Sequence, residues 1–236
     1  MKEIAKDLFQ IPLLPRNGIN AYIAEGFLID AGIRSSGKKL LKAIDEYGRT
    51  KIKAHVLTHA HADHQGSSAF ICDTLQIPLW CGEKDVAAME NGTVTAAYDN
   101  PNHPVTRFQE RYWAGPKYPV TRGLKEGDTV GSFTVLETPG HSAGHIALWR
   151  ERDGVLIAGD VVVNMNLLTT VAGLHEPPAL FTDNIAQNRA SIIKLAQLQP
   201  KIICVGHGAP LYEIDKLTTL ANQFAVHSSN APVASL

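Results

Sequence analysis

The chain has 236 residues, of which 44% are hydrophobic and 19% are charged, and its formal net charge is −1. This length and composition supply enough core for one large domain, and we expect a single domain over residues 1–236. The near-neutral charge argues against nucleic-acid binding through a basic surface, and apolar runs such as "VLIA" are too short to cross a bilayer.

Apolar segments of strand length alternate with segments of helical periodicity along the chain. The first strands are "NAYIAE" and "FLIDAG", a hairpin with Gly26 at the bend, and the helix "SGKKLLKAIDEYG" follows with Ser36 as its candidate N-cap. Later strands are expected in "AHVLTH", "IPLWCG", "SFTVLETPG", "HIALWRE", "GVLIAGDVVV" and "KIICVGHG", and later helices in "QGSSAFICDTLQ", "NIAQNRASIIKLAQL" and "LYEIDKLTTLANQF". The stretch Val86–Arg122 is mixed in character and fits neither pattern. This alternation predicts an α/β fold with covered sheets.

The segment "LTHAHADHQG" concentrates side chains that bind metals. In an extended segment, residues two apart project to the same side, so His59 and His61 can reach a single ion. Asp63 and His64 follow, where Gly66 allows a tight turn into the next helix, and they can reach a neighbouring ion. Imidazole and carboxylate groups are suitable ligands for zinc, iron or manganese.

Three later strand-to-loop junctions supply further groups of the same kind. They place His141 in "ETPGHSAGH", Asp160 in "VLIAGD" and His207 in "IICVGHG". Side chains at strand ends of an α/β sandwich converge on one rim of the sheets, where binding sites in such folds tend to lie. We therefore expect these residues to meet the first cluster.

The order HxHxDH, then GH, then GD, then GHG resembles that of the metallo-β-lactamase superfamily of dinuclear metallohydrolases, over essentially the whole chain. The resemblance implies a four-layered αβ/βα sandwich with two mixed β-sheets face to face and helices outside. It implies that one ion is bound by His59, His61 and His141, that a second is bound by Asp63, His64 and His207, and that Asp160 bridges the two together with a water or hydroxide. Zinc is the metal expected first, with iron or manganese as alternatives.

Two divalent ions about 3.5–4 Å apart can share a hydroxide that is deprotonated near neutral pH. This metal-bridging hydroxide is the expected nucleophile, and a metal would hold the developing oxyanion. Asp63 is the expected catalytic residue, since in this interpretation it lies close enough to orient the hydroxide or to shuttle its proton.

Departures from the subgroups of the family narrow the reaction. Asp160 is present, whereas antibiotic-hydrolysing members typically lack the bridging aspartate, and His61 stands where flavin-dependent diiron members carry glutamate. The glyoxalase-II thioesterases have a helical extension that binds glutathione. The quorum-quenching lactonases have a tyrosine after the bridging aspartate, and the tRNA nucleases have a basic arm. We find none of these three features in the sequence. We therefore expect hydrolysis of a small-molecule ester, thioester or lactone. The alternatives are a phosphodiesterase acting on a small nucleotide and a metal-holding binding protein without turnover.

Two long stretches without clear periodicity, Val86–Arg122 and Val161–Asp183, are expected to form the walls of a pocket over the metals. The expected substrate-binding residues in them are Arg107, Arg111, Trp113 and His175. They predict an apolar cleft with a cationic edge, suited to an acyl substrate that carries a carboxylate or phosphate. Alternatively, Arg107 and Arg111 belong to a solvated helix face, His175 caps a turn, and the first stretch is a homodimer contact.

Other polar residues have two interpretations each. His145 is either a hydrogen-bond partner of the site or a packed core residue, and Asp30 either orients a ligand loop or caps a turn. Cys72, Cys81 and Cys204 are odd in number and show no CxxC spacing, and the N-terminus lacks the apolar core of a signal peptide. We expect a cytoplasmic protein with a small-molecule substrate and with neither nucleic-acid nor membrane partners.

Overall fold

The computed structural model describes residues 1–94, 100 and 102–229, without the side chains of residue 214 and residues 226–229. The strands form a seven-stranded sheet in the order β1-β2-β3-β4-β5-β6-β7, a five-stranded sheet in the order β14-β11-β10-β9-β8, and the pair β12-β13. The first sheet comprises β1 (Lys2–Ala5), β2 (Leu8–Pro12), β3 (Asn20–Ala24), β4 (Phe27–Ile29), β5 (Ala54–Val56), β6 (Leu79–Gly82) and β7 (Arg122–Leu124). The others comprise β8 (Thr129–Val130), β9 (Phe133–Glu137), β10 (Ile146–Arg150), β11 (Val155–Gly159), β14 (Ile202–Val205), β12 (Val163–Met165) and β13 (Ala172–His175).

Strand direction determines which loops meet at the rim of the sheets. Strands β4, β5, β6 and β7 are parallel to one another, so the loops that follow β4, β5 and β6 leave the first sheet at the same edge. In the second sheet β11 and β14 are parallel, and the loops that follow them also share an edge. The "HAHADH" segment follows β5, while Asp160 and His207 follow β11 and β14.

The two large sheets pack face to face through an apolar interior. Leu8, Tyr22 and Phe27 from the first sheet pack with Phe133 and Leu148 from the second. Burial of this kind contributes about 25 cal/mol per Å² of apolar surface, which favours the pairing of the two faces.

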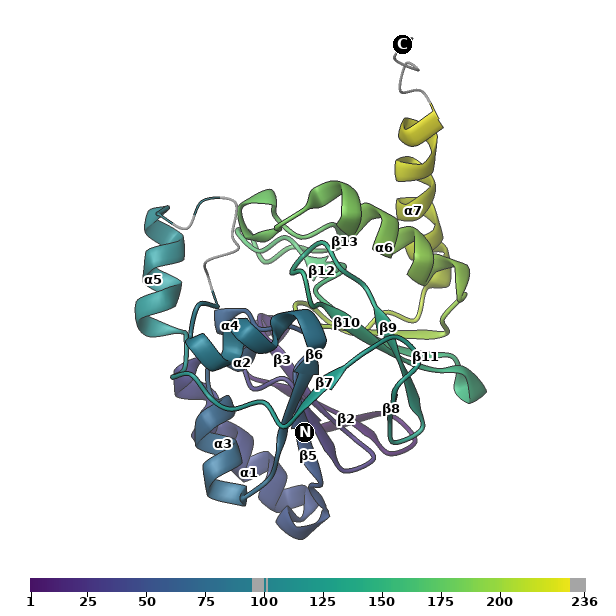
Figure 1. Cartoon of the computed structure of the whole chain (residues 1–236). Coiled ribbons are helices and arrows are strands. Elements are labelled where there is room, and N and C mark those ends of the chain that lie inside the picture. Colours follow the sequence, from purple (N-terminus) through teal and green to yellow (C-terminus); the bar gives the residue numbers. More distant parts are fainter. Residues whose placement is uncertain (95–99, 101, 230–236) are drawn as a thin grey trace.

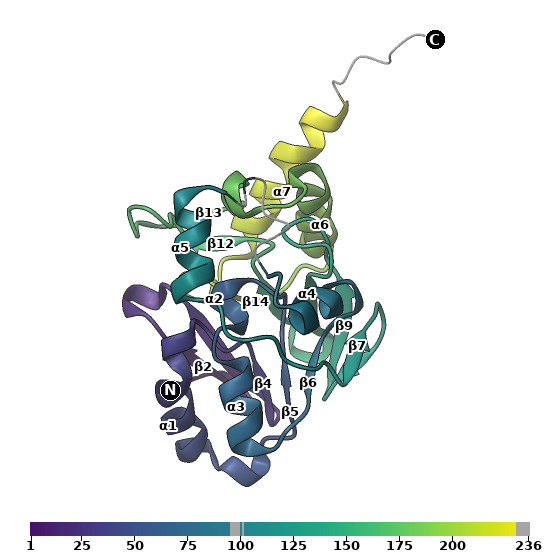
Figure 2. The same ribbon diagram turned by 60° about the vertical axis from the view of Figure 1, so that its left-hand side comes forward.

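Helices cover the two outer faces of the sheets. Helices α1 (Gly37–Tyr47) and α3 (Ser68–Leu75) pack on the first sheet, and α6 (Ile185–Gln197) and α7 (Ile214–Ser229) pack on the second (Figures 1 and 2). The expected four-layered sandwich with two mixed sheets is confirmed. In the described part of the chain, no helix has the length and apolar character needed to cross a membrane.

Most expected elements form where their patterns place them, with one correction at a cap. The hairpin turn is confirmed, and Gly26 adopts a φ of 85°, which a side chain would disfavour. Ser36 precedes α1 but its side chain makes no capping hydrogen bond. The reason is that Ser36 ends a 3-10 turn, Arg34–Ser36, and already has helical dihedral angles.

The two stretches without clear periodicity contain regular elements, and of these only the helix that carries Arg107 and Arg111 was among the alternatives. Helices α4 (Val86–Asn91) and α5 (Pro104–Tyr112) lie in the first, and the β12–β13 hairpin lies in the second. Part of the first stretch, residues 95–99 and 101, falls outside the described residues. Helix α5 buries the polar residues Thr106 and Gln109 and exposes the aromatic Phe108, which is the reverse of the usual arrangement with apolar residues on the buried face.

Candidate metal centre

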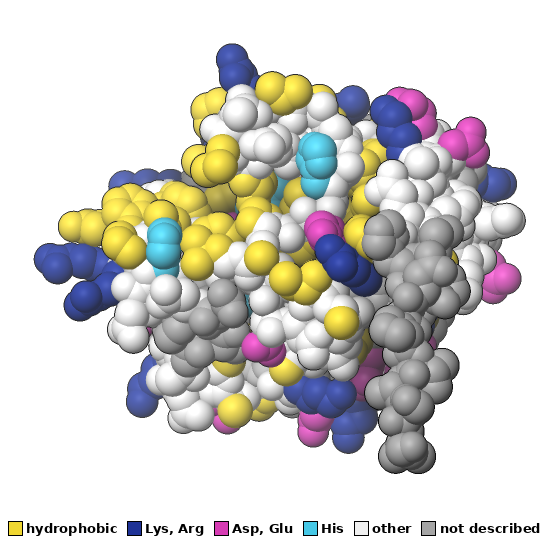
Figure 3. Space-filling model, turned by 90° about the horizontal axis from the view of Figure 1, so that it is seen from above, with side chains coloured by type: hydrophobic (Ala, Val, Ile, Leu, Met, Phe, Trp, Pro, Cys, Tyr) yellow, Lys and Arg dark blue, Asp and Glu magenta, His cyan; other side chains and the backbone are white. Residues whose placement is uncertain are grey.

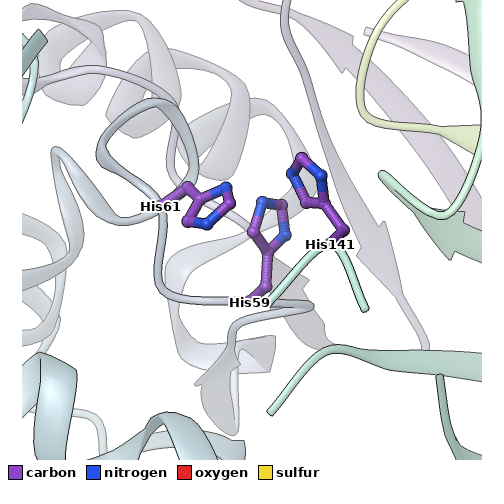
Figure 4. Close-up of side chains that lie close together, drawn as sticks. All are labelled: His59, His61 and His141. Atoms are coloured by element: carbon purple, nitrogen blue, oxygen red, sulfur yellow. The ribbon is translucent and has the colours of Figure 1, made fainter. Parts of the chain in front are cut away.

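The "HAHADH" segment folds as an extended loop followed by one helical turn. His59 and His61 lie in the loop after β5, and Asp63 and His64 lie in α2 (Ala62–Gln65). His59, His61 and His141 turn their rings toward one another (Figure 4), with ring centroids of the three pairs 4.5–4.7 Å apart. The candidate ligand atoms of these three residues all lie within 4.8 Å of one another.

A second cluster lies beside the first and shares a carboxylate with it. Asp63, His64 and His207 form a group of ligand atoms that also lie within 4.8 Å of one another. Asp160 stands between the clusters, with Oδ2 2.9 Å from Nε2 of His207, 3.4 Å from Nε2 of His64 and 3.7 Å from Nε2 of His141. The structure thus brings all seven predicted ligands to one place, with Asp160 in the position expected of a bridge.

The imidazoles are held by one nitrogen so that the other faces the centre. Nδ1 of His59 lies 3.0 Å from Oγ1 of Thr58, and Nδ1 of His141 lies 3.4 Å from Oγ1 of Thr182. Nδ1 of His207 contacts the backbone carbonyl of Gly18. Partners of this kind fix the ring orientation and tautomer of metal-binding histidines.

Buried atoms without partners test whether the cluster fits metal ions. Nε2 of His59 and Oδ1 of Asp160 are buried and have no hydrogen-bond partner among the described residues. Leaving such atoms unpaired costs about 1–3 kcal/mol each, and the charged carboxylate costs more. Because both are at the centre of a His and Asp cluster, divalent cations fit the site and would satisfy them.

Burial and neighbouring charges shift the pKa values of the site histidines in opposite directions. Burial lowers the pKa of His59 well below its usual value and that of His141 to about 4, so both rings are neutral. Burial also opposes the charging of His207, but Asp160 and Asp63 outweigh it and raise the pKa of His207 to about 10. His59 and His141 therefore offer neutral imidazole, whereas His207 holds a proton that a bound cation would displace.

Two residues with open interpretations prove to support the ligands. Asp30, at the end of β4, accepts hydrogen bonds from Nδ1 of His64 (2.9 Å) and from the backbone and hydroxyl of Thr58 (both 2.8 Å). His145 accepts the backbone N–H of Asp160 (3.0 Å) through Nε2, and its Nδ1 lies 2.8 Å from Oγ1 of Thr138. Asp30 therefore orients a ligand, and His145 orients the Asp160 loop.

Asp85 is the supporting residue that the sequence analysis missed. It follows β6 and is buried, and its carboxylate accepts hydrogen bonds from the backbone of Ala60 (2.9 Å), the hydroxyl of Ser142 (2.8 Å) and the backbone of Gly144 (2.7 Å). It thereby ties the "HAHADH" loop to the loop that carries His141. The available signal was its place just after a strand, which it shares with Asp30.

Two glycines allow close approach at the site. Gly66 lies between α2 and α3, where a turn was expected, and it has a right-handed φ of −54°. Glycine is needed there because a Cβ would lie 2.4 Å from the backbone of Arg34 and of Trp113. A Cβ on Gly206 would lie 2.0 Å from Oδ1 of Asp160, so that residue leaves room for the carboxylate.

An apolar cleft of about 370 Å³ opens above the cluster. Its floor includes ligands from both clusters, and its walls come from α5, from the β12–β13 hairpin and from the loop that follows β2. The apolar wall residues are Leu14, Pro15, Ile19, Val105, Trp113, Met165, Leu167, Leu168, Pro178 and Phe181. Hydrophobic side chains gather on this face of the molecule (Figure 3).

The predicted substrate-binding residues separate in the structure. Trp113 lines the cleft, whereas Arg107 and Arg111 lie on the exposed face of α5 and do not line it. His175 lines a larger neighbouring cavity instead. No Lys or Arg belongs to the described lining of the cleft, so Arg107 and Arg111 do not form the expected cationic edge, and their exposure agrees with the alternative of a solvated helix face. The physical reason is that Thr106 and Gln109 fix the buried side of α5, which turns both arginines to solvent.

Comparisons with known proteins agree with this geometry. The family model of the metallo-β-lactamase superfamily matches residues 14–207. The probable metallo-hydrolase YflN of Bacillus subtilis is 30% identical to the chain over 84% of the chain and 82% of YflN. The hydroxyacylglutathione hydrolase of Bdellovibrio bacteriovorus is 27% identical over 64% of the chain, which covers 47% of that enzyme.

The solved structures show the same architecture. TTHA1623 in a di-iron-bound form has a TM-score of 0.65 at 29% identity, over 86% of this chain and 94% of that one. The B3 metallo-β-lactamase BLEG-1 has a TM-score of 0.66 at 24% identity, over 90% of this chain and 96% of that one, and shares the fold. The match of the family model over most of the length shows that the chain belongs to the metallo-β-lactamase superfamily and is a metal-dependent hydrolase.

Proposed function

We propose that this hydrolase, as a single domain over residues 1–236, cleaves the ester, thioester or lactone bond of a small molecule with an apolar acyl group. The observation that carries the proposal is the position of the cluster, whose seven ligand-type side chains converge beneath an apolar cleft. Small-molecule sites are commonly concave and apolar with a few polar groups that fix the reacting bond, and this cleft has that character.

The site would hold two divalent ions. His59, His61 and His141 would bind one, Asp63, His64 and His207 the other, and Asp160 both. Zinc is our first expectation, and iron is supported by the di-iron form of TTHA1623. A bound pair of ions supplies an activated water near neutral pH and polarises the substrate carbonyl.

The side chains of the chain perform the remaining tasks. Asp63 lines the cleft, with its Oδ2 3.2 Å from Nε2 of His207, so its carboxylate is placed to orient an attacking water. The apolar walls and a bound acyl group together would exclude bulk water from the reacting bond, which strengthens electrostatic interactions there.

The charge of the walls favours an acyl substrate over a nucleotide. The two ions would pair with a phosphodiester at the reacting centre, but no Lys or Arg of the described residues lines the cleft to bind the further phosphates of a nucleotide. Acyl transfer is also the reaction suggested by the hydroxyacylglutathione hydrolase relative.

A substrate panel with metal-reconstituted protein tests the proposal. The panel contains p-nitrophenyl butyrate, a butanoyl thioester, an acyl lactone and bis-p-nitrophenyl phosphate, with Asp160→Ala as the control for contaminating activity. We expect turnover of an acyl compound that Asp160→Ala abolishes. Turnover of the phosphodiester alone would replace the proposal with a phosphodiesterase, and a protein that holds both ions without any turnover would support the metal-holding alternative.

A further inference from the structure

A second and larger cavity adjoins the cleft above the metal centre. It has a volume of about 1110 Å³ and is lined by the β12–β13 hairpin, the 3-10 turn Ala179–Phe181 and α7. Six residues line both spaces, so the two adjoin along them: Val105, Met165, Leu167, Leu168, Pro178 and Phe181.

The boundary that the two cavities share is lined by apolar residues. All six shared residues have hydrophobic side chains, and two of them are markedly open to solvent, Leu168 at 95% and Val105 at 43%. A polar or charged group would lose hydration here without gaining a hydrogen bond from these side chains. An apolar group would instead cover side chains that water now contacts, which is favourable.

Beyond this boundary, the cavity keeps an apolar interior with a polar rim. Leu174, Leu180, Leu220 and Phe224 line it together with polar side chains such as Thr219 and Gln223. Two of its charged groups are already paired within the protein, Lys216 with Glu213 at 2.9 Å and Glu176 with Arg189 at 2.8 Å. These pairs reduce the capacity of the cavity to bind a charged ligand.

We propose that the second cavity binds the distal part of an unbranched acyl chain whose carbonyl lies at the metal centre. This inference rests on the proposed function and deepens it, because it names medium- and long-chain acyl esters and thioesters as the preferred substrates. The cleft at about 370 Å³ is near the lower end of the range of small-molecule sites and holds the reacting bond with a short acyl segment. A longer chain would continue past the six shared residues toward α7.

A chain-length series measures the contribution of the second cavity. The substrates are p-nitrophenyl acetate, butyrate, octanoate and dodecanoate, used as monomers with metal-loaded protein. We expect kcat/KM to rise from butyrate to dodecanoate, by up to about fourfold for each methylene that enters the second cavity, which corresponds to about 0.8 kcal/mol.

A pair of neighbouring substitutions on α7 isolates the cavity. Thr219 is exposed and lines it, so Thr219→Trp places a large ring inside without removing a core side chain. Thr218 is also exposed but does not line the cavity, so Thr218→Trp is the matched control. We expect Thr219→Trp to abolish the rise with chain length while the kcat/KM of the acetate ester stays unchanged, and we expect Thr218→Trp to behave as wild type.

Calorimetric binding of dodecanoate, which involves no turnover, separates this inference from the proposed function. One possible result is that dodecanoate binds, that Thr219→Trp weakens this binding, and that no acyl ester is hydrolysed. In that case the proposed function fails, but the assignment of the cavity stands. If acyl esters are hydrolysed with equal kcat/KM at all chain lengths, and both tryptophan variants match wild type, the inference is overturned and the proposed function stands. A Thr219→Trp variant that alters only the sedimentation coefficient would assign the cavity to an interface between copies and also overturn the inference.

Discussion

Removal of the Asp85 carboxylate tests whether the two ligand loops are held together by this side chain. In Asp85→Ala, the buried N–H groups of Ala60 and Gly144 lose their acceptor, while the hydroxyl of Ser142 can turn to another partner. A buried donor left unpaired costs about 1–3 kcal/mol, and a water that enters the space recovers part of the loss. We therefore expect the free energy of unfolding to fall by about 2–4 kcal/mol, within the range implied by these bonds.

The assay is urea unfolding of the metal-free protein followed by circular dichroism, combined with zinc affinity measured by competition with a chelator. The affinity should fall about 10–100-fold, because Asp85 positions the loops that carry His59, His61 and His141. Asp85→Asn keeps the volume and one acceptor oxygen, so it should fall between wild type and Asp85→Ala in both measurements. The reasoning is refuted if Asp85→Ala unfolds within about 0.5 kcal/mol of wild type, the usual range for surface substitutions, and retains wild-type zinc affinity.

Three further outcomes are expected. Elemental analysis of protein purified without chelator should give about two divalent ions per chain, and the His207→Ala variant should hold about one. Retention of both ions by the variant would contradict the assignment of His207 as a ligand of the second ion. Trp113→Ala should raise KM about five- to tenfold with unchanged metal content, because Trp113 lines the cleft. Arg111→Ala should leave KM unchanged, and equal effects of the two substitutions would contradict the cleft geometry. The pKa of the Glu25 carboxyl is also shifted. Burial raises it, but hydrogen bonds from Ser132 and the charge of Arg150 have the larger, opposite effect, so the pKa lies below the ordinary 4.5. Above pH 4.5, Glu25→Gln should lower the free energy of unfolding by about 0.5–1 kcal/mol. This difference from wild type should vanish as the pH falls through the lowered pKa of Glu25. Chemical denaturation that shows the same loss at every pH would refute the prediction.

The metal cluster could be predicted from the sequence because its residues follow strands. His59, His141, Asp160 and His207 each come shortly after an apolar segment, and parallel strand ends meet at one edge. The two unassigned stretches also contained many of the cleft-wall residues, whereas Leu14, Pro15 and Ile19 come from the loop after β2, which was not expected to contribute.

The surroundings of the cluster could not be predicted in the same way. Asp85 is a single carboxylate in "GEKD", and only the fold shows that three donors converge on it. The cationic edge failed because the rotation of α5 depends on the burial of two polar residues, Thr106 and Gln109, which no hydrophobic pattern marks. The second cavity depends on how α7 stands against β12–β13, a contact between segments far apart in the chain.

The seven ligand-type residues are divided between the two sheets, and this division links metal binding to folding. Four of them, His59 to His64, follow a strand of the seven-stranded sheet, and His141, Asp160 and His207 follow strands of the five-stranded sheet. Neither sheet alone holds a complete set for either ion, so the full site exists only after the two faces have docked. A bound pair of ions would therefore link the two sheets at this edge of the sandwich, and the free energy of unfolding should rise with the free metal concentration.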